Sequence, residues 1–342
     1  MKAKTCVDTK EVTVKLLRQD DVSEEASSDK AMLILIDGYF DSAYDENGNS
    51  VWSMNNYRNF GTNNLGIDYN KFDVYVIGFK PDCTGLNNAA VDIGSFISTL
   101  QDYEQINLLG ISKGATVFCK ALENIPEDML KKTNLYTVAS PFKGTILASP
   151  EQLKEQARKK LPIIGSIIYK KLYEPHYTYT PVDNDIGLEA DFIKSLDTDR
   201  MKAVLSKVNF INIVTSCNRH SLVKAIKKLD GMAILQHILS GAIVKGDGIV
   251  HKDSQNYFSP LAKKVVPING PHSWILGEVE TGRYIGQIIK DTISGETTSC
   301  NRERKGLLNR IRHRQSRRGP TGRETRKSSV INVTRGQGHY ED

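Results

Sequence analysis

Residues 106–121 read INLLGISKGATVFCKA, and three adjoining patterns in this stretch decide the fold. INLLGI (106–111) is short and apolar, as expected of a buried strand. A Gly-Ile-Ser-Lys-Gly turn occupies 110–114, and TVFCKALENI (116–125) is typical of a helix. The order of strand, turn and helix predicts a sharp turn that raises the Ser112 hydroxyl above the end of the strand.

Further strands and helices alternate on both sides of this stretch. We expect additional strands at 31–37, 72–79, 135–140, 208–216 and 265–268, and helices at 89–103 and 277–293. Residues 11–17 alternate between polar and apolar and predict an edge strand, whereas 38–70 predict a long loop. Strands separated by helices indicate an α/β fold, with a mostly parallel sheet and helices on both faces.

Residues 146–207 interrupt this rhythm and are interpreted as an insertion. They contain helical, Lys-rich and aromatic pieces without a clear strand. LPIIGSIIYKKLY (161–173) combines an apolar cluster with Lys and Tyr. Such a segment is either a cap packed on the body or a helix that lies on a lipid surface.

The charge is divided unevenly between two parts of the chain. The net charge of the 342 residues is +6, yet residues 301–342 hold 12 basic and 4 acidic residues and carry +8. We therefore predict a nearly neutral domain at 1–300 and an Arg-rich, disordered tail at 301–342. The body gives no case for nucleic-acid binding, and the tail allows only weak, sequence-blind contact with polyanions or anionic membranes.

Composition excludes several classes of protein. No run approaches the roughly 20 apolar residues of a transmembrane helix, and the N-terminus lacks the apolar run of a secretory signal. The five cysteines are an odd number without C-x-x-C spacing. They predict reduced thiols in a cytoplasmic protein, with no zinc site among them.

Gly110-Ile111-Ser112-Lys113-Gly114 is a G-x-S-x-G sequence, and its position gives the pattern its meaning. A strand-to-helix turn holds its serine in a strained conformation, and the two glycines leave room for neighbouring backbone. The N-terminus of the following helix supplies a positive dipole and N–H donors. The alternative is a glycine-rich turn with no chemical role.

With this segment the sequence resembles the α/β-hydrolase superfamily, and within it the lipase-like esterases, over roughly residues 30–295. Four segments carry the resemblance, in the expected order: LIDGY (35–39), GISKG (110–114), SPFKGT (140–145) and GDGIV (246–250). Asp37 and Phe142 stand where lipases usually or often have His.

The resemblance implies a catalytic triad in the chain order serine, acid, histidine. Ser112 is the expected nucleophile. His272, in the turn NGPHSW before the closing helix, is preferred as the base over His251, which continues the acid loop. GDGIV implies Asp247 as the acid.

Two other acids, Asp230 and Asp253, lack the setting of Asp247. The oxyanion donors are expected to be the backbone N–H groups of Lys113 and of Tyr39, with Gly38 as the second choice to Tyr39. The Lys113 side chain is expected to point to solvent or to the rim of the site. No metal or organic cofactor is implied.

The function implied is hydrolysis of carboxylic esters by a serine enzyme, with a hydrophobic acyl chain favoured by the apolar insertion. Two alternatives stay open. A thioesterase or an acyltransferase would use the same three residues. A non-catalytic protein of this fold could instead be tethered to nucleic acid or to an anionic membrane by the tail.

Overall fold

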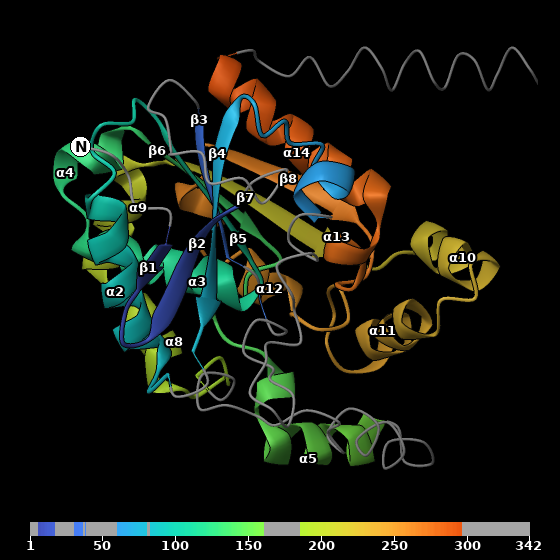
Figure 1. Ribbon diagram of the computed structural model, residues 1–342. Helices are drawn as coiled ribbons and strands as arrows, with labels where there is room; N and C mark the ends of the chain where they lie inside the picture. The colour runs from blue at the N-terminus through green and yellow to red at the C-terminus, as the bar shows by residue number, and fades with distance from the viewer. Residues whose placement is uncertain are drawn as a thin grey trace, which may run out of the picture. The chain divides into compact units, whose positions relative to one another are not determined.

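The computed structural model describes residues 6–17, 31–36, 38, 60–80, 83–160 and 185–295 (Figure 1). Tyr39, residues 161–184 and the tail at 301–342 lie outside the described residues. The expectations about them, including the domain boundary near residue 300, stay predictions.

A single sheet forms the centre of the described chain, with strand order β1-β2-β4-β3-β5-β6-β7-β8. β1 and β2 run antiparallel to their neighbours. The other six strands, β4-β3-β5-β6-β7-β8 in sheet order, run parallel to one another. The strands are Cys6–Asp8, Val12–Leu17, Ala31–Ile36, Phe72–Phe79, Ile106–Ile111, Thr133–Val138, Asn209–Ser216 and Lys264–Asn269. The expected mostly parallel α/β sheet is confirmed.

The prediction of an edge strand at 11–17 is wrong. β2 lies between β1 and β4 and is hydrogen-bonded on both sides. The edge is formed by β1, which has three residues. A strand that short carries too few residues to show an alternating pattern.

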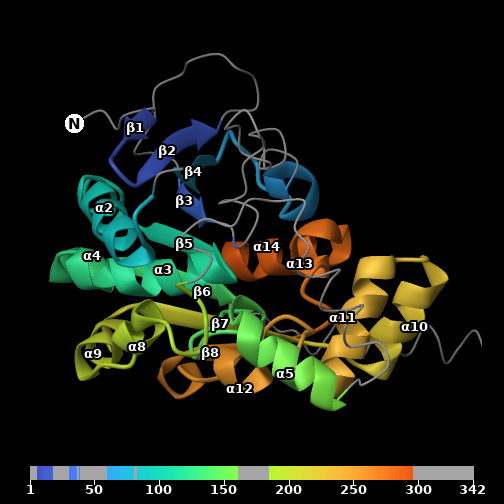
Figure 2. The same cartoon turned by 90° about the horizontal axis from the view of Figure 1, so that it is seen from below.

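Helices cover both faces of the sheet (Figures 1 and 2). α2 (Leu86–Ser98), α3 (Lys113–Ala121), α8 (Asp191–Leu196) and α9 (Asp199–Lys207) contribute apolar side chains to one core cluster. α14 (Val279–Ser294) belongs to a second cluster, which includes the opposite side chains of the same strands. The remaining helices are α4 (Glu127–Lys131), α5 (Pro150–Lys160), α10 (Arg219–Lys227), α11 (Gly231–Ala242), α12 (Lys252–Gln255) and α13 (Trp274–Gly277). Short helical turns occupy Leu122–Asn124, Ile146–Ala148 and Ser259–Leu261.

The stretch predicted as a long loop at 38–70 is helical in part. Phe60–Asn64 forms one helical turn, and Phe60 and Leu65 pack into the second core cluster. This turn lies on α14, where a Cβ at Gly286 would stand 1.9 Å from the Leu65 carbonyl oxygen. The glycine on α14 therefore permits a backbone contact that polar composition alone did not indicate.

The described parts of the insertion at 146–207 are helical. Phe192 and Leu196 of α8 and Met201 and Leu205 of α9 are buried in the first core cluster. These two helices are therefore part of the body of the domain. A lid or cap remains a prediction for the part of the insertion before them.

Three asparagines join the amino ends of neighbouring strands. The register places Asn107, Asn134 and Asn209 side by side on β5, β6 and β7. The Asn134 amide donates to Asn107 Oδ1 at 2.8 Å, and the Asn209 amide donates to Asn134 Oδ1 at 2.7 Å. Asn107 itself donates to the Met32 carbonyl at 2.8 Å. Buried amides of this kind stabilise the sheet because every lost partner leaves a polar atom without water.

We predict that Asn134→Ala lowers the free energy of unfolding by about 2 kcal/mol, since it removes one buried and one half-buried hydrogen bond. Asn209→Ala removes one bond from a half-buried residue and should cost about 1 kcal/mol. Urea unfolding of both variants measures the difference. Equal losses would contradict the role of Asn134 as the middle member of the row.

Candidate active site

Ser112 lies at the turn between β5 and α3, in the conformation that its sequence predicts. Its φ and ψ are 52° and −121°, a backbone conformation that residues other than glycine seldom adopt. The preceding Gly110 permits the turn, because a Cβ there would stand 2.4 Å from Ala115 Cα. The strain is held by the helix on one side and by a 2.8 Å hydrogen bond from the Ser112 amide to the Val138 carbonyl of β6.

Gly38 packs directly against Ser112. A Cβ at position 38 would lie 2.7 Å from Ser112 Cβ and 3.3 Å from its hydroxyl oxygen. Gly38 therefore approaches the serine with its backbone, and a larger residue at this position would displace one of the two. The structure thus brings the second-choice oxyanion residue to the serine, whereas Tyr39 lies outside the described residues.

The loop that carries Asp247 is shaped by the glycines on either side of the acid. Gly248 has a φ of +91°, and a Cβ there would stand 2.2 Å from the Gln236 carbonyl oxygen of α11. A Cβ at Gly246 would stand 2.1 Å from the Val250 carbonyl oxygen. Both positions therefore require glycine, which accounts for the Gly-Asp-Gly sequence.

The Asp247 side chain is fully buried, and both of its oxygens accept hydrogen bonds. Oδ1 accepts from the backbone N–H groups of Ile249 at 2.9 Å and Val250 at 2.8 Å. Oδ2 accepts from the Thr215 hydroxyl at 2.6 Å and the Gln255 amide at 3.2 Å. A buried carboxylate is tolerated only with such partners.

His272 completes this set, because its Nδ1 lies 2.7 Å from Asp247 Oδ2. The backbone joins the same two residues, since the His272 amide donates to the Asp247 carbonyl at 3.1 Å. The next residue is also fixed, by a 2.9 Å hydrogen bond from the Ser273 amide to Gln236 Oε1. With Nδ1 against the carboxylate, Nε2 is the ring nitrogen left for proton transfer.

The three sequence-predicted residues lie on loops at one edge of the sheet. Ser112 follows β5 and His272 follows β8, so both are at the carboxyl ends of parallel strands. Asp247 is joined to that edge through Thr215, near the end of β7. Ligands and reacting groups of open α/β sheets bind at this edge. Asp247 and His272 are in contact, and the contact of His272 with Ser112 is part of the proposal below.

The alternative residues have structural roles. His251 caps the N-terminus of α12, where its Nδ1 accepts from the Asp253 amide at 3.2 Å, and its side chain is 41% exposed. Asp230 caps α11 and accepts from the Trp274 indole at 3.0 Å. None of these three residues hydrogen-bonds to His272 among the described contacts.

The expectation for the Lys113 side chain is wrong. It is fully buried, and its ammonium group lies 4.8 Å from the centre of the Phe79 ring. The turn at Ser112 points the first residue of α3 inward, against the end of β4, and the long aliphatic stem fills space there. The Lys113 backbone N–H remains in the first turn of α3, where the helix dipole is positive.

Sequence reasoning missed the two side chains that hold the acid. Gln255 accepts from the Thr215 amide at 2.8 Å and donates to the Val250 carbonyl at 3.2 Å, so it ties β7 to the acid loop. Thr215 could have been found as a polar residue near the end of a buried strand. Gln255 lies on a four-residue helix that has no pattern of its own.

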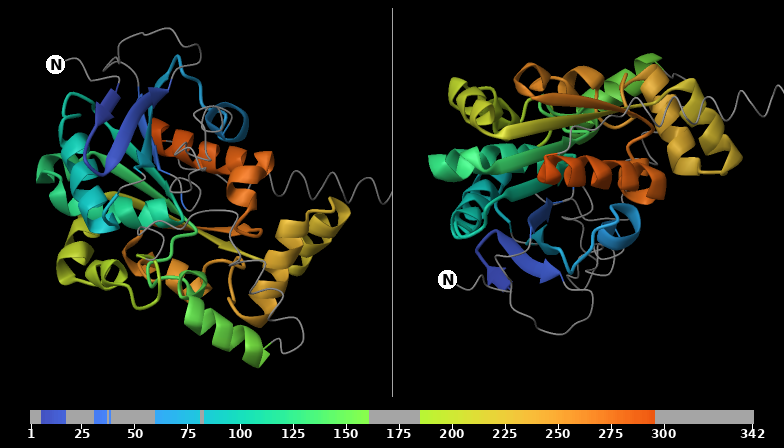
Figure 3. Two further views of the ribbon diagram at one scale, coloured as in Figure 1. Left: turned by 60° about the horizontal axis from the view of Figure 1, so that its bottom comes forward. Right: turned by 90° about the horizontal axis from the view of Figure 1, so that it is seen from above.

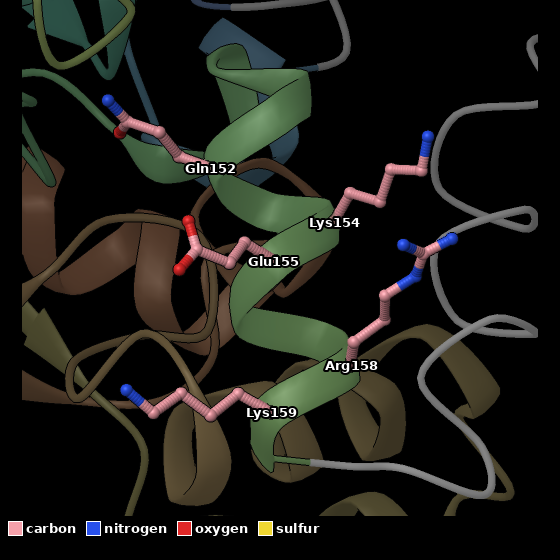
Figure 4. A pocket seen from close by; sticks show the side chains of 5 residues that line it. All are labelled: Gln152, Lys154, Glu155, Arg158 and Lys159. Carbon is pink, nitrogen blue, oxygen red and sulfur yellow. The ribbon is translucent and has the colours of Figure 1, made fainter.

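The described residues contain no group of three or more His, Cys, Asp or Glu that could hold a metal ion. A hollow of about 630 Å³ lies elsewhere, against α5 (Figure 4). It is lined by the polar side chains Gln152, Lys154, Glu155, Arg158 and Lys159. None of the residues that surround Ser112 or Asp247 lines it.

No protein-family model matches the sequence, and no curated protein matches it. Solved structures do resemble the fold. A Bacillus licheniformis lipase is 12% identical, with a TM-score of 0.48, over 75% of this chain and 90% of that one. A Bacillus subtilis carboxylesterase is 14% identical, with a TM-score of 0.43, over 85% and 90%. A metagenomic carboxyl esterase is 15% identical, with a TM-score of 0.44, over 81% and 78%.

The chain has the α/β-hydrolase fold. This assignment rests on the strand order of the sheet and on the turn at Ser112 between β5 and α3. A fold hosts many chemistries, so the function is argued from the site alone.

For the ester hydrolysis proposed below, we predict that Thr215→Val lowers kcat about tenfold and leaves KM nearly unchanged. The variant removes a hydroxyl donor from the Asp247 carboxylate, and a hydrogen bond to a charged group contributes about 1.5–3 kcal/mol. Thr137→Val is the matched control, because Thr137 is equally buried on β6 but donates to Asn212. Steady-state kinetics and thermal unfolding of both variants measure the effect. Equal kcat losses in the two variants would show that Thr215 acts through stability only.

Proposed function

We propose that this protein is a serine hydrolase that cleaves carboxylic esters through an acyl-enzyme on Ser112. One observation supports this above all others. A serine is held in a strained turn at a helix N-terminus, on the sheet edge where a buried Asp247 carboxylate binds the imidazole of His272. Strain and a fully hydrogen-bonded buried acid are costly features, and both are typical of catalytic sites.

In the proposed acylation step, Ser112 Oγ attacks the ester carbonyl carbon, and His272 Nε2 accepts the hydroxyl proton. Asp247 keeps the Nδ1 proton in place and stabilises the imidazolium that forms. The carbon–oxygen bond to the alcohol then breaks, and His272 returns the proton to the departing alcohol. The acyl group remains on Ser112.

The negative charge that develops on the carbonyl oxygen needs preorganised donors. The Lys113 N–H, in the first turn of α3, is the first donor that we propose. The second comes from the loop after β3, from Tyr39 or Gly38. The contact of Gly38 with Ser112 supports this loop as the second wall of the oxyanion hole.

In the proposed deacylation step, His272 removes a proton from water, whose oxygen attacks the acyl carbon. The bond between the acyl carbon and Ser112 Oγ then breaks, His272 returns the proton to Oγ, and the carboxylic acid is released. We propose that the substrate has a hydrophobic acyl chain. The insertion between β6 and β7 contains an apolar cluster at 161–173, and an apolar segment there favours such a chain. Chromogenic esters from acetyl to palmitoyl would measure this preference.

We predict that a fluorophosphonate probe labels the protein once, at Ser112. Ser112→Ala and His272→Ala should each lower kcat by several orders of magnitude, about 10⁶-fold in a fully tuned triad, and Asp247→Asn somewhat less. Peptide mapping by mass spectrometry locates the label, and ester hydrolysis gives kcat.

Ser221→Ala is the matched control for labelling. Ser221 Oγ lies 2.8 Å from His237 Nε2, so the described chain holds a serine–histidine contact outside the proposed site. Ser221 belongs to the N-terminal cap of α10, and His237 lies on α11 with its Nδ1 against the Ala233 carbonyl, so the pair has no acid partner among the described contacts. Labelling that persists in Ser112→Ala, or that is lost in Ser221→Ala, would overturn the assignment.

A further inference from the structure

The hairpin of α10 and α11 (Arg219–Ala242) projects from the body, as Figures 1 and 3 show. Its exposed surface carries several large apolar side chains. More than half of the exposed large apolar side chains in the described part of the chain lie on it, namely Val223, Ile226, Leu229, Met232 and Ile238. Scattered apolar side chains are common on surfaces, but a set on one projecting element marks an interaction site.

Leu229, in the turn between α10 and α11, is unfavourable in two respects. Its side chain is 86% exposed, and its backbone has a φ of 53°. The Leu229 amide bonds to the Ile226 carbonyl and the Asp230 amide to the Ala225 carbonyl, which together form a Schellman motif that ends α10. Glycine or asparagine normally occupies this left-handed position. A leucine there strains the backbone and packs against nothing in the described protein.

The charge of the hairpin indicates which partner would repay this cost. Residues 219–242 contain four Lys or Arg and one Asp, so their net charge is +3. Lys224 pairs with Glu278 and Glu280, and Lys228 pairs with Glu278. Arg219 and Lys227 are exposed on α10 together with Val223 and Ile226. Apolar side chains flanked by cations are suited to an anionic lipid surface, where each cation contributes about 1 kcal/mol.

We propose that the α10–α11 hairpin docks the protein on anionic phospholipid surfaces, with Leu229 inserted among the acyl chains. Binding of the hairpin to lipid does not depend on the function proposed above. A role of the hairpin in bringing lipid esters to the active site does rest on that function. Two other occupants of this surface are a second copy of the chain and residues 161–184. Neither explains why cations are exposed beside the apolar side chains, whereas an anionic lipid surface does.

The hairpin is joined to both catalytic loops. Gln236 of α11 accepts from the Ser273 amide next to His272, and its carbonyl packs against Gly248 next to Asp247. Asp230, in the same turn as Leu229, accepts a hydrogen bond from the Trp274 indole of α13. A membrane bound by this hairpin therefore lies beside the elements that carry the acid and the base, where a lipid ester would enter.

The test is flotation of the full-length Ser112→Ala protein with phosphatidylcholine vesicles, with and without phosphatidylglycerol. We expect binding that requires phosphatidylglycerol and weakens with salt. Leu229→Asn in this background should lower the partition coefficient about tenfold, because a leucine side chain leaves the bilayer. Asparagine tolerates a positive φ, so the melting temperature should stay unchanged or rise.

Val91→Asn is the matched control, since Val91 is 49% exposed on α2, far from the hairpin (Figure 1). Its partition coefficient should equal that of Ser112→Ala. The tail at 301–342 is the same in all variants, so its attraction for anionic lipid does not affect the comparison. Equal partition coefficients for Leu229→Asn and Val91→Asn, or no binding of the parent protein to the vesicles, would overturn the proposal.

A fall in the melting temperature of Leu229→Asn would also overturn it, because it would show that Leu229 packs within the protein. Esterase activity of the wild-type protein is measured separately, so the two proposals can fail independently.

Discussion

The buried carboxylate of Asp247 is the constraint on which the site depends. A charge in the protein interior costs several kcal/mol unless donors surround it, and here they come from four places: β7, α12, the loop around Asp247 itself, and His272. Meeting this requirement fixes the position of the imidazole relative to the sheet. The two glycines and the glutamine on α12 are therefore as much part of the site as the residues that we propose to react.

The two ends of the parallel strands have different roles. At the amino ends, Asn107, Asn134 and Asn209 bond to one another and hold the strands in register. At the carboxyl ends, the backbone at Ser112 adopts a conformation that costs free energy. A sheet stabilised at one end can carry strain at the other. The α10–α11 hairpin adds an apolar surface beside the strained end.

Local patterns in the sequence predicted the strands from 31 onward, the turn at Ser112 and the pairing of Asp247 with His272. Each has a short signal: an apolar run, a glycine spacing or a motif. Features that depend on distant partners could not be predicted, among them the burial of Lys113 against Phe79 and the Gln255 contacts with Thr215. β1 lacked a pattern because it has three residues. The exposure of Leu229 emerges only when the path of α10 and α11 is known.

The most direct test of the central claim is to observe the acyl group on the enzyme during turnover. A p-nitrophenyl ester is mixed with the protein, the reaction is stopped in acid, and the digested chain is analysed by mass spectrometry. The account predicts a burst of p-nitrophenol and a peptide containing Ser112 that has gained the mass of the acyl group. Turnover in which the acyl group is found on another residue would contradict it.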